Sequence, residues 1–410
     1  MKKPDFFSLK TFSWALYDFA NTIFSMNVIS LYFPLWVTIT VGAEDIYLSY
    51  AISASMLAVA FTAPSLGNLS DRKGYKLPFI LLFTLISVFF TALIGFSYTL
   101  LAGLILFAVA NYCYQAGLIF YDALLPRISP KGMIGKVSGM GVALGYLGTI
   151  FGILMVQPFV RDKSENLKAF IPTAVLFLLF SIPLFVFVKE ERAVAKASES
   201  VSFPLLKTYK RLKEASAYPG ILPYLIAHFL YLDTINTVIA FMSVYAVKVM
   251  GFSQEGGQVQ KFLMISTASA VFGSFIIGFI TDRLMPKKSL QIVLLLWVFT
   301  LLLIIFAPSK AFFYIAGGVA GIALGGIWTA DRPLLISLTP PEKIAEFFGL
   351  YYMSGKFAAV LGPLIWGGVV WGFEPLGIFK YKIAVFVLLL LIIASMFVLK
   401  RVPEKRADRG

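Results

Sequence analysis

Long apolar runs alternate with short polar segments along the whole chain. Most runs reach the ~20 residues that a helix needs to cross ~30 Å of hydrocarbon. Backbone in lipid has to satisfy its own hydrogen bonds, so we predict that each run is a membrane helix. Twelve such runs are present: Phe12–Thr40, Ile46–Leu69, Leu77–Phe96, Thr99–Tyr121, Met133–Val160, Phe170–Val188, Ile221–Val247, Val259–Ile280, Leu290–Phe306, Ala311–Leu335, Phe347–Val370 and Ile383–Leu399.

The composition supports a membrane protein and predicts its orientation. Hydrophobic residues make up 59% of the chain and charged residues 14%, against about 45–50% and about 25% in soluble domains. With twelve spans, 26 of the 35 Lys and Arg residues fall on one side. Because positive residues concentrate in cytoplasmic loops, we expect a multi-pass protein of the cell membrane with both termini in the cytoplasm.

The polar punctuation of the first half recurs in the second half. Four ordered matches at offsets of 210 to 215 positions indicate a duplicated half, which in a membrane chain is typical of transporters. The matched segments are Asp18–Thr22 with Asp233–Thr237, Gly67–Arg72 with Gly278–Arg283, Gly139, Gly145 and Gly152 with Gly349, Gly355 and Gly362, and Val188–Arg192 with Val402–Arg406.

The duplication predicts the domain organisation. We expect an all-α membrane protein with six-helix bundles at 1–192 and 219–410, related by a pseudo-two-fold axis. A linker, residues 193–218, joins the predicted bundles. Its Phe203–Lys213 part fits either a short amphipathic helix on the inner leaflet or a solvated connection.

Three ionisable residues fall at mid-membrane depth: Asp18, Asp233 and Lys356. A buried charge costs at least ~2.5–3.5 kcal/mol on insertion scales, so each needs a partner or a function. Lys356 fits either a substrate carboxylate or a fixed ion pair with Asp233, and the polar residues around Asp18 fit either a site or a seam between helices. The predicted substrate- or ion-binding residues are Tyr17, Asp18, Asn21, Asn111, Gln115, Asp233, Asn236 and Lys356.

A second group of charges lies at the predicted cytoplasmic ends of helices. Asp71 is placed to accept hydrogen bonds from an exposed helix N-terminus, whose dipole favours an anion. Asp122 and Asp331 fit interfacial salt bridges or a gate, whereas His228 fits a structural role. An ordinary positive-inside loop is the simpler reading of the Asp71 segment. The predicted gating residues are Gly67, Asp71, Arg72, Asp122, Arg127, Asp282, Arg283, Asp331 and Arg332.

Two sets of motifs resemble known transporters. Gly67–Lys76 resembles the loop motif of the major facilitator superfamily, and the order of the twelve spans agrees with it. Ser13–Thr22, Tyr32–Leu35, Pro341–Lys343, Glu346–Tyr351 and Ser354–Lys356 resemble the autophagy-related vacuolar effluxer branch of that superfamily. The resemblance implies two bundles that rock around a central site, an aspartate at position 71 that latches them, and amino-acid efflux in the eukaryotic members.

Several other classes of function are disfavoured. The chain has no Walker loop, H-E-x-x-H, G-x-S-x-G or dinucleotide-binding motif, so we expect a secondary transporter that is not an enzyme. With one cysteine, Cys113, and one histidine, it offers no Cys/His zinc site. We expect a monomer without a metal or organic cofactor, coupled to protons or sodium. Its basic residues are dispersed, which disfavours nucleic acid as a partner.

The predicted transport function keeps three alternatives. One membrane cation between two membrane carboxylates favours a small zwitterion such as an amino acid, moved by alternating access. The 16% aromatic content and the acidic groups also permit proton-coupled efflux of a drug or cation. A transporter-shaped receptor or lipid-handling protein without solute flux is the alternative of another class.

Overall fold

The computed structural model describes residues 8–43, 45–160, 163–191, 212–252 and 258–404. These residues are almost entirely helical, and no strand occurs among them. Eleven helices within the described ranges are long and apolar enough to cross a membrane. They are α3 (Asp45–Lys73), α4 (Leu77–Ile94), α5 (Leu100–Ile128), α6 (Ile134–Val156), α7 (Phe170–Phe187), α9 (Ile221–Lys248), α10 (Gln258–Leu284), α11 (Pro286–Ile305), α12 (Lys310–Leu338), α13 (Ile344–Gly372) and α14 (Phe379–Leu399).

The first predicted span is helical but changes its hydrogen-bond pattern. It runs as α1 (Leu9–Phe24), the π-helix η1 (Ser25–Tyr32), the short α2 (Phe33–Leu35) and the π-helix η2 (Trp36–Thr40). Pro34, which has no backbone N–H to donate, lies in α2. Together with the eleven helices above, this helical segment confirms the twelve predicted spans.

The duplication extends to helix lengths and caps. Helices α5 and α12 have 29 residues each and start 210 positions apart, at Leu100 and Lys310. The N-caps are Thr99 and Ser309, whose hydroxyl oxygens accept hydrogen bonds from the backbone N–H groups of Ala102 and Phe312. A capping hydroxyl satisfies one of the N–H groups that a helix start leaves without an intrahelical partner. The two halves therefore share the same local signals.

The chain divides into two compact units, each of which takes a short stretch from the other half of the sequence. Unit 1 comprises Met1–Met133, Met140–Arg211 and Pro340–Tyr352, and unit 2 comprises Ile134–Gly139, Leu212–Thr339 and Met353–Gly410. Most of the predicted linker, including the 203–211 part of its possible amphipathic helix, lies outside the described residues. The bundle boundaries at 192 and 219 therefore stay a prediction.

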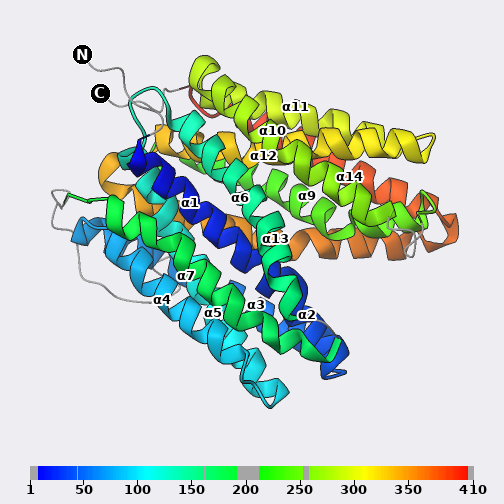
Figure 1. Ribbon diagram of the computed structural model, residues 1–410. Coiled ribbons are helices and arrows are strands. Elements are labelled where there is room, and N and C mark those ends of the chain that lie inside the picture. The colour runs from blue at the N-terminus through cyan, green and yellow to red at the C-terminus, as the bar shows by residue number, and fades with distance from the viewer. Residues whose placement is uncertain (1–7, 44, 161–162, 192–211, 253–257, 405–410) are drawn as a thin grey trace. The chain divides into compact units, whose positions relative to one another are not determined.

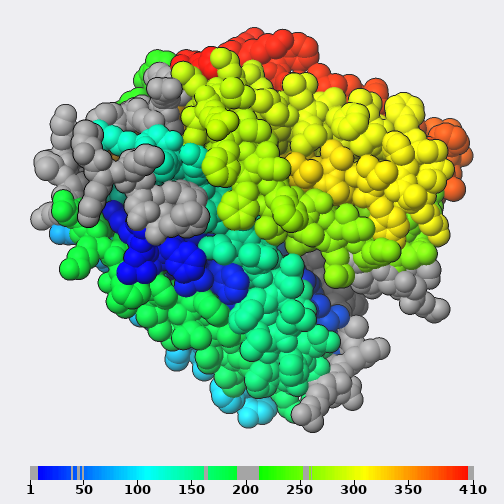
Figure 2. Space-filling view, turned by 45° about the horizontal axis from the view of Figure 1, so that its top comes forward, coloured from blue at the N-terminus to red at the C-terminus, as the bar shows by residue number. Residues whose placement is uncertain are grey.

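Unit 1 packs around α1. This helix lies along α7 in Figure 1, and Figure 2 shows its surface (blue) beside that of α6 and α7 (teal to green). The Trp14 ring stacks on Tyr121 of α5, and its Nε1–H donates to the Tyr121 carbonyl at 3.1 Å. Glycines let α6 approach α1 closely, because a Cβ at Gly148 would lie 2.4 Å from the Phe19 carbonyl oxygen.

Unit 2 also packs through small residues. Helix α12 runs against α10 and α11, and α9 lies along α14 (Figure 1). A Cβ at Gly321 of α12 would lie 2.0 Å from the Ser266 carbonyl oxygen of α10. Helices that cannot rely on the hydrophobic effect in lipid gain contact by this close approach.

Large apolar side chains are exposed on most helices of both units. The exposed fraction reaches 59% for Phe89, 68% for Leu101 and Phe272, and 64% for Leu364. Soluble monomers rarely expose large apolar patches, whereas a bilayer covers apolar side chains that face outward. The outward chemistry of the helices therefore agrees with the predicted membrane location.

Candidate functional site

The first predicted gating residue, Asp71, caps a helix from the other half of the sequence. Its Oδ2 accepts a hydrogen bond from the backbone N–H of Glu346, in the first turn of α13, at 2.8 Å. Its Oδ1 accepts from Lys76 Nζ at 2.5 Å, and both side chains are almost fully buried. Gly67 makes the approach possible, since a Cβ there would lie 2.0 Å from the Ala345 carbonyl oxygen. All of these residues belong to unit 1.

Its counterpart in the second half, Asp282, does the same in unit 2. Its carboxylate oxygens accept from the backbone N–H groups of Gly135 at 2.7 Å and Lys136 at 3.0 Å, in the first turn of α6. An anion at this place interacts favourably with the helix dipole and satisfies N–H groups that the helix leaves unpaired. The sequence predicted the acceptor role of the aspartate, but it did not predict which helix start each one caps.

A charged network extends from the Asp71 loop. Glu190 Oε2 accepts from the backbone N–H groups of Lys76 and Leu77 at 2.7 and 2.8 Å, which caps α4. Its Oε1 pairs with Arg127 at 2.5 Å. Burial lowers the pKa of the Lys76 ammonium, and the charge of Asp71 opposes this shift in part. The Lys76–Asp71 pair is thus a desolvated, buried ion pair.

Asp122 and Asp331 both accept hydrogen bonds from tyrosine hydroxyls of other helices. Asp122 Oδ2 accepts from the hydroxyl of Tyr352 on α13 at 2.5 Å, whereas Arg127 pairs with Glu190. Asp331 Oδ1 accepts from the hydroxyls of Tyr224 and Tyr231, both at 2.5 Å. Arg127 is five residues after Asp122 and Arg332 directly follows Asp331, and neither spacing places two side chains on the same face of a helix.

The remaining gating arginines differ in environment. Arg283 is exposed and Arg332 is 8% exposed. One guanidinium nitrogen of Arg72, Nη1, is buried without a hydrogen-bond partner among the described residues. The gating role of this group stays a prediction.

The predicted site residues of unit 1 lie along α1 and α5. The hydroxyl of Tyr17 hydrogen-bonds Thr84 Oγ1 of α4 at 2.6 Å and its ring lies among aromatic rings of α5 and α7. Asp18, 7% exposed, faces Gly141 and Gly145 of α6. Tyr17 and Asp18 therefore lie on different sides of α1.

The amides of unit 1 are also buried. Asn21 Nδ2 has no hydrogen-bond partner among the described residues. Asn111 donates from Nδ2 to Ser55 Oγ at 2.8 Å, while its Oδ1 stays without a partner in the same set of residues. Gln115, one turn further along α5, is 7% exposed. Buried amide groups with unused hydrogen-bonding capacity are unusual in proteins, and the binding role of Asn21 and Asn111 stays a prediction.

In unit 2, Asp233 and Lys356 do not form the ion pair that was one of the two expectations. Asp233 is 1% exposed, and neither carboxylate oxygen has a hydrogen-bond partner among the described residues. The side chain instead faces Gly362, whose added Cβ would lie 3.3 Å from Asp233 Cγ. Gly355 and Gly362 form the face of α13 that packs on α9. Lys356 lies roughly 100–120° round α13 from that face, so it points elsewhere.

A buried polar cluster that we did not predict connects three helices of unit 2. His228 of α9 lies with Nε2 3.5 Å from Asp331 Oδ2 of α12, and its Nδ1 is 3.2 Å from Ser354 Oγ of α13. Ser354 Oγ also donates to the Leu225 carbonyl at 3.2 Å. His228 and Asp331 are both 0% exposed. The sequence signal was present, because an ionisable residue inside a membrane helix is a functional candidate by default.

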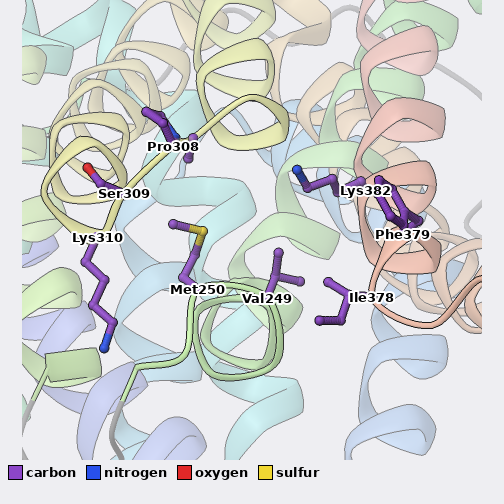
Figure 3. A pocket seen from close by; sticks show the side chains of 9 residues that line it. Val249, Met250, Pro308, Ser309, Lys310, Ile378, Phe379 and Lys382 are labelled. Carbon is purple, nitrogen blue, oxygen red and sulfur yellow. The ribbon is translucent and has the colours of Figure 1, made fainter.

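A pocket at another part of unit 2 contains none of the predicted site residues. It has a volume of about 520 Å³ and lies where α9 and α11 end and where α12 and α14 begin. Figure 3 shows Met250, Lys310, Phe379 and Lys382 around it. We do not place the substrate there, because the buried ionisable groups lie elsewhere.

Comparison with known proteins gives the class. Almost the whole chain matches solved structures of major facilitator transporters. For the transporter FucP, in its outward conformation, the TM-score is 0.75 at 12% identity over 97% of this chain and 99% of that one. A bacterial homologue of the iron transporter ferroportin gives 0.75 at 12% identity over 96% and 98%. At this identity the likeness shows the fold alone, which is the predicted major facilitator fold of twelve membrane helices.

Sequence comparison gives the branch. Residues 37–133 and 131–410 match the family described as "Vacuole effluxer Atg22 like". The uncharacterized MFS-type transporter YxiO of Bacillus subtilis is 27% identical over 96% of this chain and 94% of its own length. Autophagy-related protein 22 of Eremothecium gossypii is 23% identical over 87% and 84%. The chain belongs to the Atg22-like family of major facilitator superfamily transporters, as its motifs suggested.

Proposed function

We propose that this transporter moves a small zwitterionic solute, with an amino acid as the favoured substrate, by secondary active transport. The observation that carries the proposal is Asp233, a buried carboxylate in a membrane helix without a hydrogen-bond partner among the described residues. Leaving such a group without a partner in an apolar environment costs roughly several kcal/mol of free energy, unless a ligand or a proton compensates its charge. A substrate ammonium group would supply that compensation.

Lys356 supports the second half of the proposal. It is the only lysine or arginine in the middle of a predicted span, and it is partly exposed on α13. Gly355, its neighbour, contacts Leu232 of α9, the residue before Asp233. The two opposite charges thus belong to neighbouring helices but are turned apart, an arrangement that suits two ends of one ligand better than a direct ion pair. Lys356 would bind the substrate carboxylate.

The two aspartate caps would control access. Each holds the start of a helix from the other half of the sequence, α13 at Asp71 and α6 at Asp282. Transporters of this class alternate between states by moving one half against the other. We infer that each cap breaks and forms again in that cycle. We also propose a monomer in the cell membrane with both termini in the cytoplasm.

Uptake or efflux in reconstituted vesicles tests the substrate proposal. The wild-type protein, screened against radiolabelled amino acids, is expected to transport at least one of them. Lys356→Met and Asp233→Asn should each abolish most of that transport. Lys382→Met is a matched control, because Lys382 lies at the start of α14 and outside the proposed site. Undiminished transport by both site variants would remove these residues from the proposal.

A second candidate is proton-coupled efflux of an organic cation, and the same observation favours it. A lone buried carboxylate is a suitable partner for a cation without a carboxylate of its own. In that case Asp233→Asn abolishes transport whereas Lys356→Met has little effect. The two variants therefore separate a zwitterion from a cation. Flux of labelled lipid without any solute flux would instead indicate a lipid-handling protein.

A further inference from the structure

The buried cluster of unit 2 places polar groups on both sides of the His228 ring. Asp331 Oδ1 accepts two tyrosine hydroxyls, and Asp331 Oδ2 faces His228 Nε2 at 3.5 Å. On the other side of the imidazole ring, Ser354 Oγ is 3.2 Å from His228 Nδ1 and also 3.2 Å from the Leu225 carbonyl oxygen. The series of polar groups therefore runs from a carboxylate on α12 through a histidine on α9 to a hydroxyl on α13.

The positions of these atoms are compatible with two protonation states, with the 3.5 Å separation of His228 Nε2 and Asp331 Oδ2 longer than an ordinary hydrogen bond. A neutral imidazole with its proton on Nε2 is directed at the Asp331 carboxylate, while Nδ1 accepts the hydroxyl proton of Ser354. An imidazolium keeps Nε2–H toward Asp331 and donates Nδ1–H to Ser354 Oγ. The hydroxyl proton of Ser354 then turns to the Leu225 carbonyl, its acceptor at 3.2 Å. The states differ by one bound proton and by the direction of one hydrogen bond.

We propose that His228 and Asp331 form the proton-binding site that couples this transporter to a proton gradient, and that Ser354 transmits its occupancy to α13. This rests on the proposed transport function and deepens it. The proton comes from water, resides on His228 Nδ1 and leaves by the same atom, so no other bond forms or breaks. Lys356 lies two residues after Ser354, so the proton site and the proposed carboxylate-binding residue share α13.

The charged surroundings are compatible with binding one proton. On the elements packed here, the titratable and charged side chains near the cluster in sequence are Tyr224, Tyr231 and Asp233 of α9, Arg332 of α12, and Tyr351, Tyr352 and Lys356 of α13. Helices α10, α11 and α14 carry their charged residues only near their ends. An imidazolium next to a carboxylate forms a neutral pair, whereas the deprotonated state leaves one buried negative charge, which two tyrosine hydroxyls stabilise.

The chain has one histidine, so its imidazole can be observed alone. The full-length protein, carrying a tag without histidine and labelled with 15N-histidine, is titrated in detergent micelles and its ring nitrogens are followed by NMR. We expect a single imidazole that changes from the Nε2–H form to the imidazolium as the pH of the sample is lowered. Asp331→Asn should move this transition to lower pH, and Ser354→Ala should change the Nδ1 signal. Ser395→Ala, another buried serine on α14, is the control.

A second measurement links the site to transport. In vesicles with an imposed proton gradient, His228→Gln should lose the stimulation of uptake by the gradient. An imidazole that stays in one neutral form over the whole pH range, in the wild type and in Asp331→Asn, overturns the proposal. So does full gradient stimulation in His228→Gln. A wild-type protein that titrates as expected but transports no amino acid or cation would instead contradict the proposed function alone.

Discussion

The carboxylate of Asp71 accepts a hydrogen bond from the backbone N–H of Glu346, a residue 275 positions later in the chain. The same carboxylate holds the ammonium group of Lys76, which is 1% exposed. One side chain therefore caps a helix of the second half and neutralises a buried cation of the first half. Its counterpart Asp282 caps the start of α6 in the same way.

Replacing Asp71 tests this double role. Asp71→Asn keeps the shape of the cap but leaves the Lys76 ammonium buried without its anion, which typically destabilises by about 3–5 kcal/mol. We expect a clearly lower melting temperature in detergent. Adding Lys76→Met should restore much of the loss, because it removes the uncompensated charge. Glu374→Gln, in an exposed pair with Lys380, is the control and should change little. Equal melting temperatures of wild type and Asp71→Asn would contradict the role.

Close packing of α3 on the start of α13 gives a second prediction. A Cβ at Gly349 would lie 2.4 Å from the Ala63 carbonyl oxygen, and one at Gly67 would lie 2.0 Å from that of Ala345. Alanine at either position has to push backbone away, at a cost of about 1–3 kcal/mol. Gly368→Ala on the same α13 meets nothing within 4 Å and should not destabilise. Melting temperatures of the three variants check this, and a stable Gly67→Ala would show that the helices separate without cost.

The cap by Asp282 can be followed in α6 directly. Asp282→Ala removes the acceptor of the Gly135 and Lys136 N–H groups, and loss of such a cap costs about 0.5–2 kcal/mol. Hydrogen–deuterium exchange should become faster in residues 134–139, while exchange in the first turn of α13 stays unchanged. If residues 134–139 exchange at the same rate in the wild type and in Asp282→Ala, Asp282 does not stabilise the start of α6.

Lys76 predicts a dependence of stability on alkaline pH. Burial lowers the pKa of its ammonium in the folded protein, so the unfolded chain binds the proton more tightly. At pH values between that lowered pKa and the ordinary lysine value of about 10.4, the unfolded state holds more protons than the folded state, so stability rises with pH. Lys76→Met should flatten this rise in a series of melting curves at increasing pH. A wild-type protein whose stability falls through this range, with the same slope in Lys76→Met, would contradict the assignment.

The sequence predicted the spans and their order, because a helix that crosses lipid needs a long apolar run. It also predicted that Asp71 caps a helix, since the residue type and its place at a helix end carry that information. The partners lay beyond its reach: Glu346 is 275 positions away, and the choice among helix starts depends on packing. The rotation of helices was equally hidden, so Asp233 and Lys356, which are similar in depth, could be expected as an ion pair although they face different ways.

The cluster around His228 shows the same limit. The histidine, Asp331 and Ser354 are each visible in the sequence, but three different helices bring them together. The π-helical turns after α1 have no clear sequence signal either, apart from Pro34. Local chemistry is readable from one chain, whereas contacts between helices require their positions.

The central claim is that Asp233 and Lys356 bind the two ends of one zwitterionic substrate. Uptake of labelled amino acids into vesicles that contain wild type, Asp233→Asn, Lys356→Met or the control Lys382→Met tests it most directly. The account predicts transport of an amino acid by the wild type and the control, and a loss of most of it in both site variants. Transport that survives Lys356→Met and Asp233→Asn undiminished would contradict it.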